Sequence, residues 1–359
     1  MKIKTDKILS FKKMLWSLVI VVATIILFGL IIFFLNLNAK DKDLQNLKIN
    51  LPLKNNFTDQ QAETCDNCLP DILTGELKPE ASGYPLAVIV DNHLDARPAL
   101  GLSQAKLVYE VPVEGGITRY LAIFSSDQEI EAIGPVRSAR PYFIDWVEPL
   151  SALFVHCGGS PEALVDIIQK DIIDLNEFYN ADYFWRDSSR PAPHNVITSS
   201  DKLSAYLEKN NLSKASLISW QFKADISPSK QAKEALEINI DYIADSHEVL
   251  WLYDQKTGKY IRNLAGEKHE DASGQIISAK TVIIKEVNSE VVDEKLRLKI
   301  DSQGEDKAVI CFLGKCEEGS WKQTSASARE RYYVNGEEVV FLPGNFWIEV
   351  VDQEVSYSY

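Results

Sequence analysis

The sequence has no surplus of basic residues. It carries 38 Lys and Arg against 52 Asp and Glu, so its formal net charge at pH 7 is −14. A protein that binds nucleic acid without sequence preference needs a basic face that replaces the counterions of the phosphate backbone. The composition therefore argues against general nucleic-acid binding, and we predict no nucleic-acid partner.

Internal repeats and low-complexity tracts are also missing, which argues against solenoid architectures. The 359 residues are 45% hydrophobic and 25% charged, an ordinary composition for a globular protein. A chain of this length suffices for one large domain or two of medium size.

Cysteine is sparse, with five residues in the chain. None precedes Cys65, so no residue near the N-terminus could carry the lipid of a lipoprotein. Cys311 and Cys316 flank a short turn, and a disulfide across it is plausible. A local structural disulfide is also favoured for Cys65 and Cys68, because a thioredoxin-like role would need a strand before them and a helix after them. Cys157 then remains as the odd thiol.

The only long hydrophobic run lies at the N-terminus. Residues 14–35 contain no charged side chain, and at about 1.5 Å per residue they can cross a hydrocarbon core of about 30 Å. Five lysines and one aspartate precede the run, a bias that keeps this end in the cytoplasm. We predict a cytoplasmic tail over 1–13 and a transmembrane helix, acting as a signal anchor, over 14–37. A cleaved signal peptide is the alternative, although its apolar core is usually only about 7–15 residues.

The rest of the chain should then face outward, in the cell envelope. Residues 38–80 are polar and lack periodicity, which indicates an extracytoplasmic stalk. Residues 81–215 mix strand and helix patterns, and predict an α/β or α+β subdomain with a mixed sheet. The expected strands are 86–92, 106–113, 117–125 and 152–156, and the expected helices are 138–150, 161–172 and 200–210.

Residues 216–359 are dominated by paired β-rich runs and predict a β-rich C-terminal subdomain packed on the first. Asn335 and Gly336 stand between two such runs, a strong signal for a type I′ hairpin. The last expected strand is 345–351.

Arginine replaces lysine in one segment. The chain has 28 Lys and 10 Arg, yet residues 86–195 hold two Lys and six Arg. The guanidinium group is a planar, always charged fork that suits carboxylates and phosphates. The segment can therefore form an anion site, or its arginines can pair with internal carboxylates. The six arginines are Arg97, Arg119, Arg137, Arg140, Arg186 and Arg190.

A glycine-containing loop follows the strand expected at 152–156. Ser160 can cap a helix whose first residue is Pro161, and the free amides of a helix N-terminus favour an anion. The segment that leads into the helix at 138–150 brings two arginines that could reach the same pocket. The predicted ligand-binding residues are Arg119, Arg137, Arg140, Gly158, Gly159, Ser160, Arg190 and His194.

Asp91, Glu114, His156 and His194 are the candidates for acid and base catalysis. The two carboxylates stand at strand ends, where they could equally stabilise turns. His93, His156 and His194 could converge on zinc, but the sequence has no H-x-x-x-H or H-E-x-x-H pair. We therefore predict no metal and no cofactor, and the sequence leaves open whether the chain is an enzyme.

Four stretches carry a resemblance to a known family: 85–124, with VDNHLDARPALGL and EGGITRY, then 133–143, 154–164 and 184–199. They resemble the YerB-like lipoprotein family, whose domain has no known function. Its second, β-rich region is similar to the segments around Arg262, around His269 and Asp271, and over 342–348.

The resemblance covers about residues 80–352 and implies a membrane-tethered, extracytoplasmic bacterial protein without an established reaction. Two departures stand out: family members typically carry a lipobox cysteine, and they often have alanine where Cys157 stands. We therefore predict an envelope protein that binds an anionic ligand. A hydrolase of envelope glycans or peptides and a protein-interaction scaffold are the alternatives.

Overall fold

A computed structural model describes residues 68–359. The predicted cytoplasmic tail, the transmembrane helix and most of the stalk lie outside the described residues. Within residues 68–359, no helix has the length and apolar character that a membrane crossing requires.

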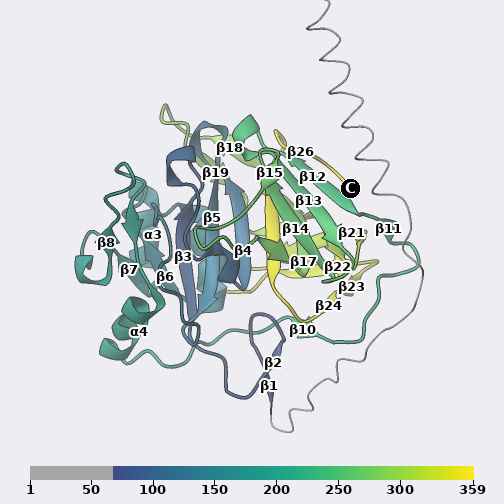
Figure 1. The fold of residues 1–359 in the computed structure, drawn as a ribbon, viewed down its shortest axis with the longest axis horizontal. Coiled ribbons are helices and arrows are strands. Elements are labelled where there is room, and N and C mark those ends of the chain that lie inside the picture. The colour runs from purple at the N-terminus through teal and green to yellow at the C-terminus, as the bar shows by residue number, and fades with distance from the viewer. Residues whose placement is uncertain (1–67) are drawn as a thin grey trace, which may run out of the picture. The chain divides into compact units, whose positions relative to one another are not determined.

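A twelve-stranded mixed sheet forms the centre of the described part (Figure 1). Its main path runs, in spatial order, through β23 (Glu337–Glu338), β22 (Arg331–Val334), β21 (Lys315–Gln323), β20 (Gly304–Phe312), β17 (Thr281–Glu286), β25 (Phe346–Val351), β4 (Leu107–Pro112), β5 (Thr118–Ser125), β3 (Pro85–Asp91), β6 (Leu153–His156) and β7 (Asp174–Asn176), while β11 (Lys233–Glu234) pairs with β21.

Strand β25, which belongs to the C-terminal half, joins the two halves of the chain. It pairs in parallel with β17 on one side and with β4 on the other, where Trp347 lies opposite Val108. Figure 1 shows this yellow strand next to the blue strands of the N-terminal half. The sheet therefore continues across the boundary expected near residue 215.

The two faces of β3 bury different side chains, as the alternation of a strand dictates. Leu86 and Val88 belong to one apolar core, and Ala87 and Ile89 belong to the other. All four side chains are fully buried. A strand covered on both faces has apolar residues at successive positions, and β3 has this pattern.

The three expected helices are present. They are α2 (Pro141–Val147), which is continued by η4 (Glu148–Leu150), α3 (Pro161–Gln169) and α4 (Ser200–Lys209). Ser160 accepts a hydrogen bond from the Ala163 amide and Pro161 is the first residue of α3, as predicted. Helices α2 and α3 contribute to the core that contains Ile89, and α4 contributes to the core that contains Val88.

A six-stranded sheet adds to the core that contains Val88. It consists of β15 (Glu267–Lys268), β14 (Lys259–Leu264), β13 (Val249–Asp254), β12 (Glu237–Asp241) and β26 (Ser356–Ser358), with β16 (Ser278–Ala279) paired to β14. The prediction that the last strand is 345–351 is wrong, because β26 follows it and pairs with β12.

Two-stranded pairs complete the fold. They are β1 (Leu69–Pro70) with β2 (Leu77–Lys78), β8 (Trp185–Arg186) with β9 (Val196–Ile197), β10 (Gln221–Phe222) with β24 (Val340–Phe341), and β18 (Ser289–Val291) with β19 (Leu298–Ile300). The β1–β2 pair lies inside the predicted stalk, and Leu73 between its strands is buried. The prediction of an irregular stalk up to residue 80 is therefore wrong for its last part.

The local turn and disulfide predictions hold where the structure tests them. Asn335 and Gly336 have φ values of 53° and 81°, which is the type I′ geometry, between Val334 and Glu337. Cys311 and Cys316 form a disulfide, and Cys157 is a free thiol. Cys68 is disulfide-bonded, while Cys65, its expected partner, lies outside the described residues.

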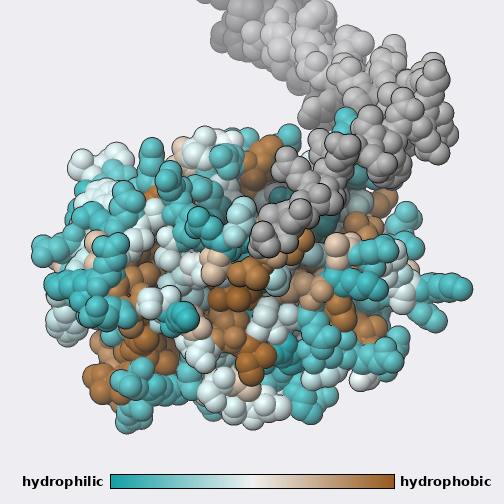
Figure 2. All heavy atoms as spheres, turned by 90° about the horizontal axis from the view of Figure 1, so that it is seen from below, coloured by the Kyte–Doolittle hydropathy of each residue, from teal (hydrophilic) through white to brown (hydrophobic). Residues whose placement is uncertain are grey.

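The face of the molecule in Figure 2 presents its apolar side chains, in brown, as separate patches divided by hydrophilic residues, in teal. A surface divided in this way is ordinary for a protein in contact with water.

Candidate functional site

Most of the predicted site residues come from one end of the central sheet and from the loops that meet it. Asp91 ends β3, and Arg119 stands directly opposite it on β5. Glu114 lies in the turn between β4 and β5, in η3 (Glu114–Gly116). The two loops that precede α2 and α3 pair with each other through Ala139 and Gly159. The sheet therefore assembles residues that are up to about 100 positions apart in sequence.

Asp91 is the centre of the first polar cluster. Its side chain is 2% exposed, and Oδ2 lies 3.0 Å from Arg137 Nε and 2.7 Å from His194 Nδ1. Burial alone would raise the pKa of Asp91, but the guanidinium groups of Arg137 and Arg119 outweigh burial, and the pKa falls below its ordinary value. Asp91 therefore stays ionised at neutral pH.

Glu114 is the second carboxylate, and it pairs with Arg140 at 2.5 Å. Burial raises its pKa, yet the hydrogen bond from Arg140 and the charge of Arg119 bring the pKa below the ordinary value. A general acid at neutral pH needs a raised pKa. Neither Glu114 nor Asp91 meets this requirement.

Arg119 lies between these two ion pairs. It is 5% exposed, Nη1 donates to the Ser138 carbonyl oxygen at 3.1 Å, and Nε has no hydrogen-bond partner among the described residues. Burial and the neighbouring Arg140 lower its pKa, while Asp91 and Glu114 oppose the shift. Three guanidinium groups, on Arg119, Arg137 and Arg140, thus share two carboxylates.

The remaining arginines of the segment bind the protein's own backbone carbonyl oxygens and side chains. Arg190 bonds the carbonyl oxygens of Ala96 and Pro98 and the carboxylate of Asp187 through its three nitrogen atoms. Arg186 pairs with Glu177 at 2.9 Å. Each nitrogen atom of Arg190 therefore already has a partner within the protein, and two of its five N–H donors remain; its assignment to a ligand stays a prediction.

Arg97 has no carboxylate partner within ion-pair distance among the described residues. It donates through Nε to the side-chain oxygen of Asn92 at 3.0 Å and through Nη1 to the Ser246 carbonyl oxygen at 2.7 Å. Its role is to tie the N-terminal half to the segment before β13.

The glycine loop is already bonded at two of its three amides. The Gly158 amide donates to Asn176 Oδ1 at 3.0 Å, and the Ser160 amide donates to the Ala139 carbonyl oxygen at 3.1 Å. The loop therefore cannot offer the row of free amides that the sequence predicts. Gly158 has a φ of 63° and packs against Phe178, which explains the glycine at this position.

A cavity of about 250 Å³ lies beside this loop. Arg140 and Ser160 line it from one side, as the sequence analysis expected for a shared pocket. Arg297 lines it from the segment between β18 and β19. Arg137 is not among its lining residues, because it turns toward Asp91 and the Pro193 carbonyl oxygen.

His156 and Cys157 are poor candidates for catalysis. His156 is fully buried, between the Gly158 carbonyl oxygen at 2.7 Å and Asp174 at 3.1 Å. Burial and the nearby Glu177 raise the pKa of the Cys157 thiol to about 11. A thiol with so high a pKa forms little of the nucleophilic thiolate at neutral pH.

A second polar cluster is buried between the two sheets. The Arg262 guanidinium bonds Glu110, and Nη1 lies 2.7 Å from His269 Nδ1. Glu349 accepts hydrogen bonds from Trp251 Nε1 at 2.7 Å and from the Tyr242 hydroxyl at 2.8 Å. Arg262, Glu110 and Glu349 have no exposed surface, so the cluster joins the sheets rather than meeting a ligand.

Burial and the charge of Glu110 raise the pKa of Glu349 to about 8. Its protonated form relieves the repulsion between two carboxylates that share one arginine. The sequence does contain a signal for this cluster, because Arg262 stands at an inward-facing position between Tyr260 and Leu264 on β14.

Comparison with known families covers both halves of the chain. The model described as "Protein of unknown function (DUF3048) N-terminal domain" matches residues 73–213, and the corresponding C-terminal domain model matches residues 238–348. The chain belongs to the DUF3048 family. The resemblance to YerB-like proteins is thereby confirmed.

One relative is the protein named "Putative lipoprotein YerB" of Bacillus subtilis (strain 168). It is 34% identical over 279 residues, which are 74% of this chain and 81% of the relative. The crystal structure of the B. subtilis YerB protein matches with a TM-score of 0.71 at 32% identity, over 81% of this chain and 100% of that one. The match confirms a β-rich DUF3048 fold with mixed sheets and few helices.

Proposed function

We propose that this DUF3048 protein is a membrane-anchored protein of the bacterial envelope that binds an anionic envelope ligand at Arg119 and Arg140. The observation that carries the proposal is the charge imbalance described above: among the described residues, Asp91 and Glu114 are the carboxylates within ion-pair distance of Arg137 and Arg140, and Arg119 has none. A buried guanidinium group normally has an anionic partner. An anion beside Arg119 and Arg140 would supply the missing charge.

The envelope location rests on two further observations. The disulfide between Cys311 and Cys316 and the disulfide-bonded Cys68 suit an oxidising compartment. The B. subtilis relative carries the name "Putative lipoprotein YerB", and lipoproteins are tethered to a membrane. The lysine-flanked apolar run at 14–35 is the anchor that we propose for this chain.

The cavity that Arg140 and Arg297 line is the entry that we propose for the ligand; Glu162 and Asp293 line it as well, and Arg119 does not. Arg140 donates through Nε to Glu114 and through Nη1 to the Ala139 carbonyl oxygen. These two bonds leave Nη2 for a ligand. Asp293 pairs with Arg297 on the other side of the cavity. The cavity therefore suits a small anion between the guanidinium groups of Arg140 and Arg297 better than a long polyanion.

The proposal is tested by replacing Arg140 in the full-length protein, purified in detergent. Arg140→Gln should weaken the binding of inorganic phosphate and of glycerol 3-phosphate by about 10-fold or more, because a charge-assisted hydrogen bond contributes about 1.5–3 kcal/mol. Isothermal titration calorimetry measures the affinity, and the melting temperature should change little.

Arg186→Gln is the matched control, because Arg186 also pairs with a carboxylate but does not line the cavity. It should bind both probes like the unmodified protein. Equal affinities of the Arg140→Gln and Arg186→Gln variants would contradict the proposal, as would the absence of binding to the unmodified protein.

A further inference from the structure

We propose that His93, Asp95 and His194 form a binding site for a divalent transition-metal ion of the zinc type. One nitrogen from each histidine and one oxygen from the aspartate all lie within 4.8 Å of one another. This proposal does not rest on the anion site. It departs from the sequence prediction of no metal, and it takes Asp95 in place of His156 beside His93 and His194.

The spacing suits a tetrahedral ion. His93 Nδ1 lies 3.6 Å from Asp95 Oδ2, and two ligand atoms at about 2.0–2.1 Å from a tetrahedral zinc ion lie about 3.4 Å apart. His93 Nδ1 accepts a hydrogen bond from the Asp95 amide at 3.2 Å, and an ion at Nδ1 would replace that bond. The rings of His93 and His194 are stacked, with centroids 4.3 Å apart. The two ring planes lie 16° apart, and an imidazole binds a metal through a lone pair in its ring plane, so the exposed His93 ring has to rotate before both histidines bind one ion.

Asp91 prepares His194 for the role of ligand. It lies 2.7 Å from His194 Nδ1, so the ring donates this N–H to the carboxylate and presents the Nε2 lone pair on its opposite side. Metal-bound histidines almost always have such a carboxylate or carbonyl partner, which fixes the tautomer and the ring orientation. Arg137 Nε lies 3.0 Å from the same Asp91 oxygen and holds the carboxylate in place.

The two segments that carry the ligands are fastened to each other before any ion arrives. Arg190, on the His194 loop, bonds the carbonyl oxygens of Ala96 and Pro98 beside Asp95. Arg137 bonds the Pro193 carbonyl oxygen from the other side at 3.1 Å. A site held in this way loses little conformational entropy when the ion binds.

The ligand set selects the class of ion. Two imidazoles and one carboxylate suit zinc or a similar first-row ion, whereas magnesium and calcium prefer oxygen ligands throughout. The side chains of His93 and Asp95 are 40% and 57% exposed, and that of His194 is 12% exposed. The ion is therefore open to solvent on one side and keeps at least one position for water or a ligand.

The test is calorimetric titration of ZnCl₂ into full-length protein purified in detergent without a histidine tag. All proteins carry Cys157→Ser, which removes the free thiol as a competing zinc ligand. We expect one zinc ion per chain, affinity at least about 10-fold lower for His93→Gln and for Asp95→Asn, and no comparable heat with MgCl₂.

Asp182→Asn, an exposed aspartate outside the site, is the matched control and should bind zinc like the parent. Cobalt(II) provides a second readout, because tetrahedral coordination gives intense visible absorption that His93→Gln should abolish. Because the side chains of His93 and Asp95 are exposed, both variants should fold. Their circular dichroism spectra should match that of the parent. The proposal is overturned if the parent does not bind zinc, or if His93→Gln and Asp95→Asn bind it unchanged.

Discussion

At the scale of single residues, burial and neighbouring charge decide which polar groups remain available. Arg137 and Arg190 pair with carboxylates of the protein, whereas Arg119 has no carboxylate within ion-pair distance among the described residues and its Nε has no hydrogen-bond partner there. The six arginines look equivalent in the sequence, but most of them bind the protein's own groups and only a smaller set is available to a ligand. The salt-bridge interpretation describes Arg137, Arg186 and Arg190, and the anion interpretation stays a proposal for Arg119 and Arg140.

The reactivity of Cys157 tests whether its thiol is buried. With a pKa of about 11, its thiol should react with iodoacetamide at pH 8 at least about 30-fold more slowly in the native protein than in urea, because an unfolded cysteine has a pKa of about 8.5. Mass spectrometry measures the rate. Glu177→Gln should speed the native reaction, since Glu177 helps to raise the pKa. Equal rates in native and unfolded protein would contradict the assignment.

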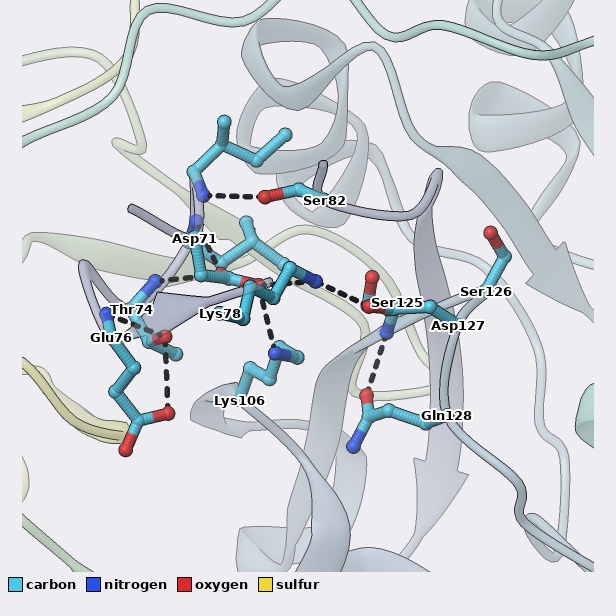
Figure 3. A network of polar contacts seen from close by, with 12 residues as sticks. Asp71, Thr74, Glu76, Lys78, Ser82, Lys106, Ser125, Ser126, Asp127 and Gln128 are labelled. Atoms are coloured by element: carbon cyan, nitrogen blue, oxygen red, sulfur yellow. Dashed lines mark hydrogen bonds and ion pairs between the residues drawn. The ribbon is translucent and has the colours of Figure 1, made fainter. Parts of the chain in front are cut away.

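At the scale of elements, the β1–β2 pair shows how a segment expected in a stalk is held on the folded body. Figure 3 shows Asp71 at the centre of a polar network. Its carboxylate accepts from the amides of Leu73 and Thr74 and lies 2.9 Å from Lys106 Nζ at the start of β4. Lys78 reaches the same carboxylate at 3.2 Å. The segment is thus fastened by charge as well as by apolar packing.

Asp71→Asn should therefore lower the free energy of unfolding at pH 7 by about 2 kcal/mol. Burial raises the pKa of Asp71, but Lys106 and the two amides lower it to about 2, from an ordinary value of 3.8. The folded protein holds this proton less tightly than the unfolded chain does. The stabilisation is therefore complete above about pH 4 and is lost as the pH falls toward 2.

Urea unfolding of the parent and the Asp71→Asn variant at several pH values between 7 and 2 measures the difference. The difference in the free energy of unfolding between the parent and the variant should disappear as the pH falls from about 4 to 2. Asp225→Asn, an exposed aspartate, should leave stability within about 0.5 kcal/mol of the parent. A gap that stays constant down to pH 2 would show that ionisation of Asp71 has no part in the effect.

At the scale of the whole molecule, the central sheet makes the two halves depend on each other. Strand β25 fills the place between β4 and β17, and Phe346, Trp347 and Ile348 on it are buried. Burying one such side chain stabilises the folded protein by about 1.5–3 kcal/mol. Arg262, which reaches Glu110 across the sheets, adds a buried ion pair whose partners come from different halves.

We therefore expect the fragment 68–215 not to fold alone, because β4 would lose its β25 neighbour and a large part of its apolar cover. Far-ultraviolet circular dichroism and a urea titration should show little structure and no cooperative transition. Co-expression with the fragment 216–359 should restore a soluble complex. A cooperative unfolding transition of the isolated 68–215 fragment would contradict the interdependence.

Local patterns in the sequence predicted the helices and most of the strands, because caps, turn residues and apolar periodicity act over a few neighbouring residues. The Ser160 cap, the turn at Asn335 and Gly336, and the fully buried β3 are examples. The position of Asp91 at a strand end was also predictable. The partners of Asp91, His194 and Arg137, stand 103 and 46 positions away in the chain, and spacing in the sequence does not indicate such contacts.

The sequence by itself determined the net acidity, the N-terminal apolar run, the family resemblance and the local elements, because each of these depends on composition or on neighbouring residues. Only the tertiary structure decided that Arg190 faces its own backbone, that Asp95 instead of His156 joins His93 and His194, and that β25 joins the halves. The physical reason is that pairing between distant strands, and the burial that follows from it, chooses each side chain's partners.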